Sequence, residues 1–546
     1  MGAAAYDYII VGGGTAGCVL AARLTEDSKT TVLMLEDGPD ARPMLMNMPA
    51  GLGPLYQKGQ YHWPYRSEPE PFAADKTQPY KMGRVLGGSS SINGLVWVRG
   101  HPQDYNDWAD SGATEWDWAS VEPYFRRIES FEDADDPRMG HAGPIPVTRG
   151  RPEKQVLSRA FLESAQEAGE TINPNYNSGN QDGFCVLHQN TRSGVRGDVR
   201  RGYLDPVRKR KNLVVLTGHT VQRLRFDGKI CTGVDVRRRG GVSQFSARRE
   251  VLLCAGSVAS PQLLELSGIG NPDVLREVGI TLRHALPGVG ENFHTHPTIA
   301  MTFKCTGPYS ILSATRGPGK IVAGSKWLFS RTGAAATNHF EAGAFLRAFK
   351  DSDRPDYQLT FLPLALTGTT GAEDVHGYQV YVELISCKSR GQSHIVSDDI
   401  SVQPRFVFNF LQEDRDVAVY RASVAMIRKI VSQPALAKLT KGELVPGAEV
   451  TDPAALDNWI RKCAGLSHHL VGTCRMGAID DPGAVVDPFL RVRGIEGLRV
   501  IDASVMPTVT TGNTHAATIV IAEKGADMVR DFVTKQSKGN FHEMSA

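Results

Sequence analysis

The chain has 546 residues, of which 41% are hydrophobic and 22% charged, and its net charge is +2. A chain of this length exceeds one typical hydrophobic core, so we expect two domains or one domain with large insertions. The small net charge argues against nucleic acid as a partner, and no apolar run approaches the roughly 20 residues that span a bilayer. The eight cysteines are scattered, as is typical of reduced thiols, and only a short leader precedes the first strand. We therefore expect a cytoplasmic protein.

The first 36 residues predict a dinucleotide-binding unit. They show the pattern of an apolar strand, a G-x-G-x-x-G turn, a helix and a second strand, at residues 6–11, 12–17, 18–24 and 31–35. Gly12 permits the tight turn, Gly14 lets the backbone approach a pyrophosphate, and Gly17 lets helix and strand pack closely. Glu36 follows the second strand, where an acid accepts hydrogen bonds from a ribose. The fingerprint alone does not separate FAD from NAD, and a glycine-rich turn in an ordinary α/β domain is the alternative.

The middle of the chain predicts further strands after a second glycine-rich stretch. Residues 83–94 are rich in glycine and serine and precede an apolar run, so we expect their backbone to lie close to something buried. A tight turn under a helix is the alternative. Strands are expected at 213–216, 221–226, 230–237 and 250–256. A helix should follow the last of them, with Ser260 as its cap, Pro261 in its first turn and Gly268 at its end.

Residues 300–460 predict a second, sheet-based domain. Strand-like runs alternate there with polar loops and one long helical stretch at 415–430, and a last helix is expected at 516–532. His294 and His296 form an H-x-H pair, which we interpret as structural because no third metal ligand of suitable spacing accompanies it. No metal site is predicted.

Together these stretches resemble the glucose–methanol–choline (GMC) oxidoreductase family, in particular its bacterial alcohol and choline dehydrogenases. The similarity runs from residue 6 to residue 529 and rests on two signatures beyond the fingerprint, at 83–93 and 256–270. Residues 287–292 and 502–523 are also typical of the family. The resemblance selects FAD over NAD. It implies an α/β, Rossmann-like FAD-binding domain and an α+β substrate domain in which helices cover an antiparallel sheet.

The implied FAD-binding domain is discontinuous and consists of residues 1–155, 205–300 and 465–535. The implied substrate-binding domain consists of residues 156–204 and 301–464, and residues 536–546 form a flexible tail. Ile92 stands where some relatives carry a flavin-linked histidine, so the FAD is expected to be non-covalent. Leu470 replaces a proline that is usual in the family, which bears on local backbone geometry.

The resemblance also assigns residues to the FAD. The first turn would hold the pyrophosphate, Glu36 the adenosine ribose, and residues 93–96 would line the flavin. Val221 would meet the adenine through its backbone. The full set implied is Gly12, Gly14, Thr15, Ala16, Gly17, Glu36, Gly83, Arg84, Val85, Gly88, Asn93, Gly94, Leu95, Val96, Val221, Asp502, Ala503, His515 and Ala516.

Two histidines carry the implied chemistry, the oxidation of a primary alcohol to an aldehyde. His469 matches the active-site histidine of the family and would act as the base for the hydroxyl proton. His515 matches the second active-site position, which is His or Asn among relatives, and would hydrogen-bond the same oxygen. N5 of the flavin would take the hydride. His468 either lines the substrate pocket or points away from it.

Two other functions remain open at this point. The first is an FAD-containing lyase on the same scaffold, as in the hydroxynitrile lyases, and the second is an NAD-linked dehydrogenase. The expected partners are a small-molecule alcohol and either oxygen or another electron acceptor. The sequence does not identify the alcohol, the acceptor or the oligomeric state.

Overall fold

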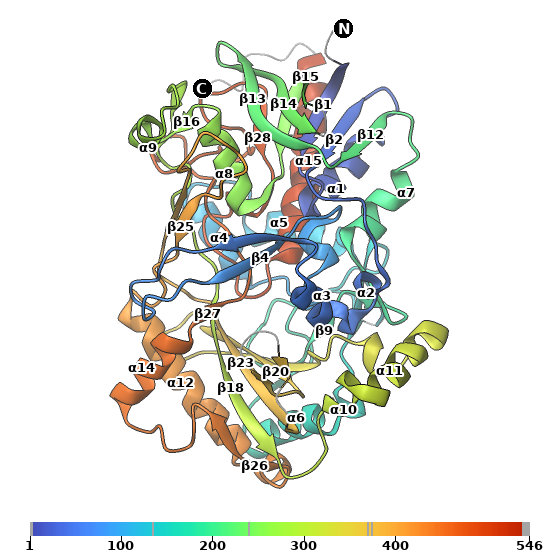
Figure 1. The fold of residues 1–546 in the computed structure, drawn as a ribbon, viewed down its shortest axis with the longest axis vertical. Helices are drawn as coiled ribbons and strands as arrows, with labels where there is room; N and C mark the ends of the chain where they lie inside the picture. The colour runs from blue at the N-terminus through green and yellow to red at the C-terminus, as the bar shows by residue number, and fades with distance from the viewer. Residues whose placement is uncertain (1–3, 134–135, 239–240, 368–370, 373–374, 538–546) are drawn as a thin grey trace.

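Two β-sheets, each with its own helices, organise the chain in a computed structural model (Figure 1). The structure describes residues 4–133, 136–238, 241–367, 371–372 and 375–537. Within these ranges, none of the helices combines the length and the apolar character that crossing a membrane requires.

The first sheet has seven strands and a parallel core. Its strands are β1 (Ala4–Val11), β2 (Val32–Glu36), β12 (Leu213–Thr217), β13 (Thr220–Asp227), β14 (Ile230–Arg238), β15 (Gly241–Leu253) and β28 (Leu498–Val500). Their order is β12-β2-β1-β15-β14-β13, and β28 pairs with β15 in parallel. Strand β1 pairs in parallel with both β2 and β15, whereas β13, β14 and β15 form an antiparallel meander. The α/β, Rossmann-like character that the sequence predicts is thus confirmed.

Two helices from opposite ends of the chain pack together beside this sheet. They are α1 (Thr15–Leu24) and α15 (His515–Ser537), and both lie behind the strands in Figure 1. Helix α15 is longer than the predicted 516–532 and includes residues 536 and 537 of the predicted tail. Residues 538–546 lie outside the described part of the chain.

The second sheet has eight strands and is mainly antiparallel. In spatial order these are β26 (Thr440–Val445), β18 (Pro297–Cys305), β23 (Gly377–Leu384), β20 (Tyr357–Leu362), β19 (Ala342–Leu346), β8 (Gly183–Val186) and β7 (Ile172–Asn173), with β27 (Gly465–Leu466) paired to β18. Helices α6 (Val156–Glu167) and α12 (Asp414–Val431) pack against the strands, and α12 confirms the helix predicted at 415–430. The helix-covered antiparallel sheet predicted for the substrate domain is therefore present.

Helix α8 (Gly256–Leu266) begins earlier than predicted. Ser260 is not its cap, and Pro261 lies inside the helix rather than in its first turn. A proline cannot bond the carbonyl four residues before it. That carbonyl, on Ser257, instead accepts a hydrogen bond from Thr473 Oγ1 at 2.8 Å. The Ser260 hydroxyl donates to Asp502 Oδ2 at 2.6 Å. Two side chains that are distant in sequence, Thr473 and Asp502, thus bond groups of this helix.

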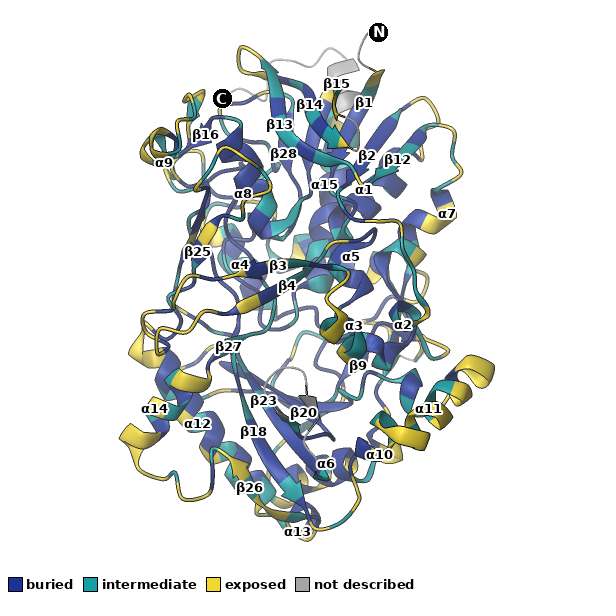
Figure 2. Ribbon diagram, in the orientation of Figure 1, coloured by how far each residue is buried: buried dark blue, intermediate teal, exposed yellow. Residues whose placement is uncertain are grey.

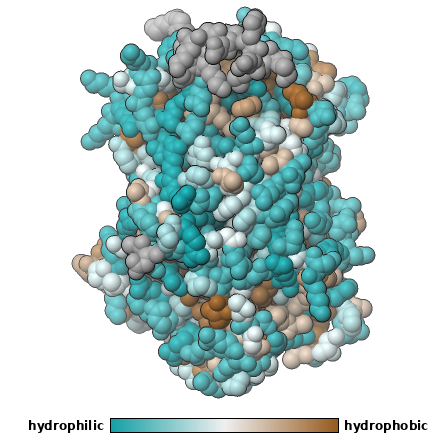
Figure 3. All heavy atoms as spheres, turned by 180° about the vertical axis from the view of Figure 1, so that it is seen from behind, coloured by the Kyte–Doolittle hydropathy of each residue, from teal (hydrophilic) through white to brown (hydrophobic). Residues whose placement is uncertain are grey.

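Each sheet has its own hydrophobic core. One cluster of buried side chains joins the first sheet to α1 and α15, and a second joins β18, β20 and β23 to α6 and α12. Figure 2 shows both sheets as buried and the outer helices as partly exposed. The face seen from behind is mostly hydrophilic, with hydrophobic side chains in small, scattered groups (Figure 3). The domain boundaries themselves remain a prediction.

Candidate active site

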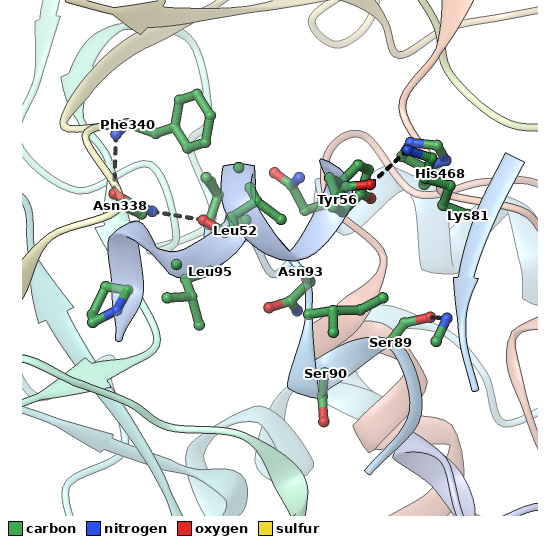
Figure 4. Close-up of a pocket in the computed structure, with 18 of the residues that line it drawn as sticks. Leu52, Tyr56, Lys81, Ser89, Ser90, Asn93, Leu95, Asn338, Phe340 and His468 are labelled. Atoms are coloured by element: carbon green, nitrogen blue, oxygen red, sulfur yellow. Dashed lines mark hydrogen bonds between the residues drawn. The ribbon is translucent and has the colours of Figure 1, made fainter. Parts of the chain in front are cut away.

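A cavity of about 910 Å³ is lined by residues of the second sheet and by residues that follow strands of the first sheet. Its wall includes the start of α1, the second glycine-rich stretch, and parts of α3 (Leu52–Lys58) and α11 (Gly317–Ser330). In Figure 4, Tyr56 of α3 lies above Asn93, with Phe340 toward one end of the pocket and His468 toward the other. The wall of this one cavity contains both predicted cofactor residues and the predicted catalytic histidines.

The two glycine-rich stretches meet where α1 begins. The Gly87 amide donates to the Gly13 carbonyl at 2.7 Å. A Cβ added to Gly14 would find no atom closer than Gly88 Cα at 3.8 Å, so the backbone there is open to a ligand. A Cβ on Gly17 would lie 1.9 Å from the Gly12 carbonyl oxygen. The helix N-terminus and the open glycine fit a pyrophosphate, while Gly17 is required by packing.

Glu36 lies at the end of β2 and braces the first turn. Its two carboxylate oxygens accept hydrogen bonds from the amides of Gly13 and Gly38, each at 2.8 Å. Burial raises the pKa of Glu36 to about 7, although these hydrogen bonds oppose the shift. Each oxygen can accept a second hydrogen bond. Contact with a ribose is therefore possible in chemical terms and stays a prediction.

The predicted cofactor residues divide into two groups. Those that line the cavity are Gly14, Thr15, Ala16, Gly83, Gly88, Asn93, Gly94, Leu95, Val96, Asp502, Ala503 and His515. Those outside its lining are Gly12, Gly17, Glu36, Arg84, Val85, Val221 and Ala516. Arg84 pairs with Asp37 and lies over the Trp63 ring, and Val85 is buried in one cluster with Ile92. Ile92 offers no atom for a covalent bond to a flavin.

His469 lies on the cavity wall between two nitrogen partners. Its Nδ1 is 3.0 Å from Nδ1 of His296, and its Nε2 is 3.0 Å from Nδ2 of Asn513. The His469 amide also donates to Thr295 Oγ1 at 3.0 Å. Burial, and then the neighbouring His296, lowers the pKa of His469 well below the ordinary value. The interpretation of His296 as merely structural is too narrow, because it bonds the predicted base directly.

A chain of hydrogen bonds orients the Asn513 amide. Gln358 Nε2 lies 3.4 Å from Asn513 Oδ1 and donates to Thr360 Oγ1 at 3.2 Å. Thr360 in turn donates to Glu383 Oε2 at 3.0 Å. With its oxygen toward Gln358, Asn513 presents its NH₂ group to His469. His469 Nε2 is then the acceptor, and its hydrogen lies on Nδ1, shared with His296.

His515 is the second of the predicted catalytic histidines, and its role stays a prediction. It begins α15 and lines the cavity, with its ring edge-on to Trp97 at 5.9 Å. Burial, and then the charge of Arg196, lowers the pKa of His515 to about 4. Its Nε2 is buried without a protein partner, as expected of an atom that meets a bound ligand. In the described residues no hydrogen bond joins His515 to His469, whose partner is Asn513.

His468 lies on the cavity wall and does not point away from it. Its φ is +61°, a conformation that is uncommon for a residue with a side chain. Its ring lies 5.0 Å from the Tyr80 ring, and burial lowers its pKa to about 3. His468 is therefore a neutral wall residue next to the predicted base.

Arg196 is a buried cation that sequence analysis missed. Its Nη1 donates to the carbonyl and side-chain oxygens of Asn93 at 2.8 and 2.7 Å, and its Nε donates to the Met46 carbonyl at 2.9 Å. Burial lowers the pKa of Arg196 to about 10. Arg196 thus holds Asn93, the first residue of the stretch predicted to line the flavin. The polar residues around position 196 gave no local signal for this role.

The cavity fits FAD on three observations. An open glycine lies at a helix N-terminus, an unpartnered buried nitrogen belongs to His515, and the wall between them is continuous. Among the described residues, no group of three or more His, Cys, Asp or Glu side chains is arranged to hold a metal ion.

Comparisons with known proteins show the family of the chain. Residues 6–298 and 387–522 match the N- and C-terminal family models described as GMC oxidoreductase. The oxygen-dependent choline dehydrogenase of Staphylococcus saprophyticus is 42% identical over 534 residues, which is 96% of this chain and 95% of that one. Oxygen-dependent choline dehydrogenase 1 of Chromohalobacter salexigens is 40% identical over 530 residues, again 96% and 95% of the two chains.

Solved structures show the same relationship. Pyridoxine 4-oxidase from Mesorbium loti superimposes with a TM-score of 0.87 at 32% identity, covering 96% of this chain and 99% of that one. Formate oxidase of Aspergillus oryzae RIB40, studied for its FAD modification, superimposes with a TM-score of 0.90 at 25% identity over 97% and 99% of the two chains. On both the sequence models and the fold, this chain belongs to the GMC oxidoreductase family.

Proposed function

We propose that His469 removes the hydroxyl proton of a primary alcohol bound in the cavity. The observation that carries this assignment is the position of Nε2, a hydrogen-bond acceptor 3.0 Å from the Asn513 amide, on two residues that both line the cavity. Burial keeps the imidazole neutral at ordinary pH, which is the form that accepts a proton. His296 shares the hydrogen on Nδ1 and so holds the ring in the tautomer that the reaction needs.

We propose further that Asn513 is the second group on the substrate oxygen. Its NH₂ is held toward His469 by Gln358, and its second N–H can donate to an oxygen that lies beside both side chains. His515, assigned to this task from the sequence, would instead meet the bound cofactor through its unpartnered Nε2. Thus His469 takes the proton, Asn513 orients the oxygen, and His296 orients His469.

The chain is a flavin-dependent alcohol oxidoreductase whose cofactor is FAD. When bound, FAD supplies the acceptor for the hydride that leaves the carbinol carbon, and the product is the aldehyde. The residues that would hold it are the glycines at the start of α1, the stretch from Asn93 to Val96 braced by Arg196, and the start of α15. These groups position the cofactor, and the histidines move the proton.

The names of the relatives suggest the remaining partners. The choline dehydrogenases are oxygen-dependent by name, so we propose oxygen as an electron acceptor here. Choline and pyridoxine, which appear in the names of similar proteins, are the first alcohols to try. All eight cysteines are free thiols, which favours a reducing compartment such as the cytoplasm.

Anaerobic mixing of the holoenzyme with these alcohols tests the proposed reaction. Oxidation predicts that the flavin absorbance bleaches and that one aldehyde forms per flavin reduced. A lyase on the same scaffold would cleave a hydroxynitrile with the flavin absorbance unchanged. Failure of every alcohol to bleach the flavin, combined with such cleavage, would overturn the proposal.

A further inference from the structure

One face of the second sheet forms part of the active-site cavity. Strands β18, β23 and β20 are neighbours in this sheet (Figure 1). Because side chains alternate along a strand, Tyr381 and Glu383 of β23 lie on the same face, and both line the cavity. Thr298 of β18 pairs directly with Glu383, and Thr360 of β20 donates a hydrogen bond to its Oε2 at 3.0 Å. The cavity wall therefore contains a carboxylate with a threonine on each neighbouring strand.

Glu383 lacks a positive partner in the described part of the chain. Burial raises the pKa of Glu383 to about 7, and the one described group that opposes this rise is the Thr360 hydroxyl. Asp502, the other carboxylate that the described residues contribute to the cavity wall, already accepts hydrogen bonds from the hydroxyls of Ser260 and Ser504, each at 2.6 Å. A carboxylate can accept about four hydrogen bonds. Glu383 is thus the carboxylate that remains for a ligand.

Glu383 also lies close to the proposed catalytic pair. It pairs with Gln358 of β20, and residues paired in this way have Cβ atoms about 4.5–5.5 Å apart. Gln358 in turn contacts Asn513, which we place on the substrate oxygen. A short alcohol can therefore have its hydroxyl at His469 and Asn513 and a second polar group at Glu383.

The surroundings of this carboxylate favour a cation that carries hydrogens. The residues that face Glu383 from the neighbouring strands are Thr298, Gln358 and Thr360, which are polar and not aromatic. A protonated amine can donate to the carboxylate and to hydroxyl oxygens beside it. A quaternary ammonium group has no hydrogen to donate and is typically held by the faces of aromatic rings. The site is therefore better suited to a protonated amine.

We propose that Glu383 binds the protonated amine of an amino alcohol and so determines which alcohols this enzyme prefers. This inference rests on the proposed oxidation of an alcohol at His469, and it adds the chemical class of that alcohol. The charge-assisted hydrogen bond between the ammonium group and the carboxylate would hold the carbinol carbon in position while His469 takes the hydroxyl proton. Glu383 contributes to binding and takes no part in the transfer of the proton or the hydride.

Three alcohols of nearly the same shape test the proposal. They are 2-(dimethylamino)ethanol, choline and 3,3-dimethylbutan-1-ol, which carry a protonated amine, a quaternary ammonium group and a neutral carbon at the same position. Each is mixed anaerobically with the FAD-loaded, full-length protein at about pH 8, above the pKa of Glu383 and below the range of aliphatic amines. The flavin absorbance gives the apparent Kd and the limiting rate of flavin reduction.

The variants separate the charge of Glu383 from its place in the fold. Glu383→Gln removes the charge but keeps an acceptor for Thr360, and Glu383→Asp keeps the charge. Glu341→Gln is the matched control. Glu341 is also buried and accepts a hydrogen bond from Thr337 Oγ1 at 2.7 Å, but it lies outside the lining of the cavity. Flavin content and the melting temperature check that each variant is folded.

We expect the wild type and Glu341→Gln to bind the amino alcohol about ten- to a hundredfold more tightly than the neutral alcohol, with choline between them. Glu383→Gln should lose most of this preference, whereas its limiting rate with the neutral alcohol should change by less than about fivefold. Glu383→Asp should keep part of the preference. If Glu383→Gln does not fold, the wild type and Glu383→Asp decide the question.

Two kinds of failure are distinguishable. If the flavin bleaches but the wild type binds the amino alcohol no better than the neutral alcohol or choline, the role of Glu383 is wrong. A preference that Glu383→Gln retains in full would overturn it equally. If the amino alcohol shows the expected preference in binding but does not bleach the flavin, the site at Glu383 is supported and the proposed oxidation is wrong.

Discussion

The two ends of the active-site cavity are built from different parts of the chain. At the end beside α1, the site consists of backbone: Gly14 is open to a ligand, and Gly87 is tied to Gly13. At the other end the site consists of the side chains of His296, His469 and Asn513. These three residues come from segments that are far apart in sequence. A backbone site needs a contiguous pattern, since its amides belong to successive residues. A side-chain site needs only a fold that brings its members together.

This difference predicts which property a substitution at each end should change. Changes at the glycine end should remove the cofactor and with it all activity. Changes at the histidine end should slow the reaction while FAD stays bound.

The largest effect is expected for Gly17→Ala. The new Cβ would lie 1.9 Å from the Gly12 carbonyl oxygen, so α1 must move away from the turn that holds the pyrophosphate. We expect protein without FAD, measured as the ratio of flavin to protein absorbance after purification. Gly442→Ala is the control, because no atom lies within 4 Å of its added Cβ. A Gly17→Ala protein with its full complement of FAD would show that the turn is not the cofactor site.

The His469→Ala variant should retain bound FAD but reduce its flavin more slowly. General-base catalysis contributes typically about 10²–10⁴-fold, and we expect a loss of that size in the rate of flavin reduction by an alcohol. Anaerobic stopped-flow absorbance measures it. A His469→Ala protein purified without flavin would contradict the separation of the two ends, because the histidine would then be part of the cofactor site.

The same contrast between the two ends of the cavity explains which features the sequence could predict. The turn at Gly12–Gly17, the acid at Glu36 and the hairpin β13–β14 were predicted because each depends on neighbours in the chain. Asn513 was overlooked although it lies two residues before His515, since only the fold shows which of the two reaches His469. Arg196 and Gln358 are single polar residues without local pattern. The start of α8 was misplaced because Thr473, far away in sequence, satisfies the carbonyl that Pro261 leaves free.

Gln358→Leu should have a smaller effect on rate. It removes the donor that fixes the Asn513 amide, worth about 1 kcal/mol or roughly fivefold in rate. In an Asn513→Ala background the same change should cost nothing more, because both residues act on one hydrogen bond. Gln379→Leu is the control, a buried glutamine of β23 that bonds Thr302 at 2.9 Å instead. Additive losses in the double variant would show that Gln358 acts through general stability.

The smallest functional effect is expected at His394, away from both ends of the cavity. Nδ1 is 2.7 Å from Glu265 and Nε2 is 3.0 Å from Glu291. Burial opposes the charged ring, but these two carboxylates raise the pKa of His394 to about 9. Because the folded pKa lies above the unfolded one, this stabilisation is complete below about pH 6.5 and is lost as the pH rises through about 9.

The raised pKa means that the charged ring adds to the free energy of unfolding at low pH. Urea midpoints of the wild type should therefore fall between about pH 6.5 and pH 9.5, and those of His394→Gln should fall much less. FAD content should stay the same in both proteins. Parallel midpoints for the two proteins across this range would show that His394 is not the group responsible.

The central claim is that His469 works with Asn513 rather than with His515. The most direct test compares Asn513→Ala and His515→Ala in anaerobic flavin reduction at saturating alcohol. Loss of a hydrogen bond to a charged oxygen is worth about 1.5–3 kcal/mol, so Asn513→Ala should reduce its flavin about ten- to a hundredfold more slowly. His515→Ala should be slowed less and should change the absorbance spectrum or the affinity of the bound flavin. A normal rate for Asn513→Ala together with a slow His515→Ala would contradict the account and return the second active-site role to His515.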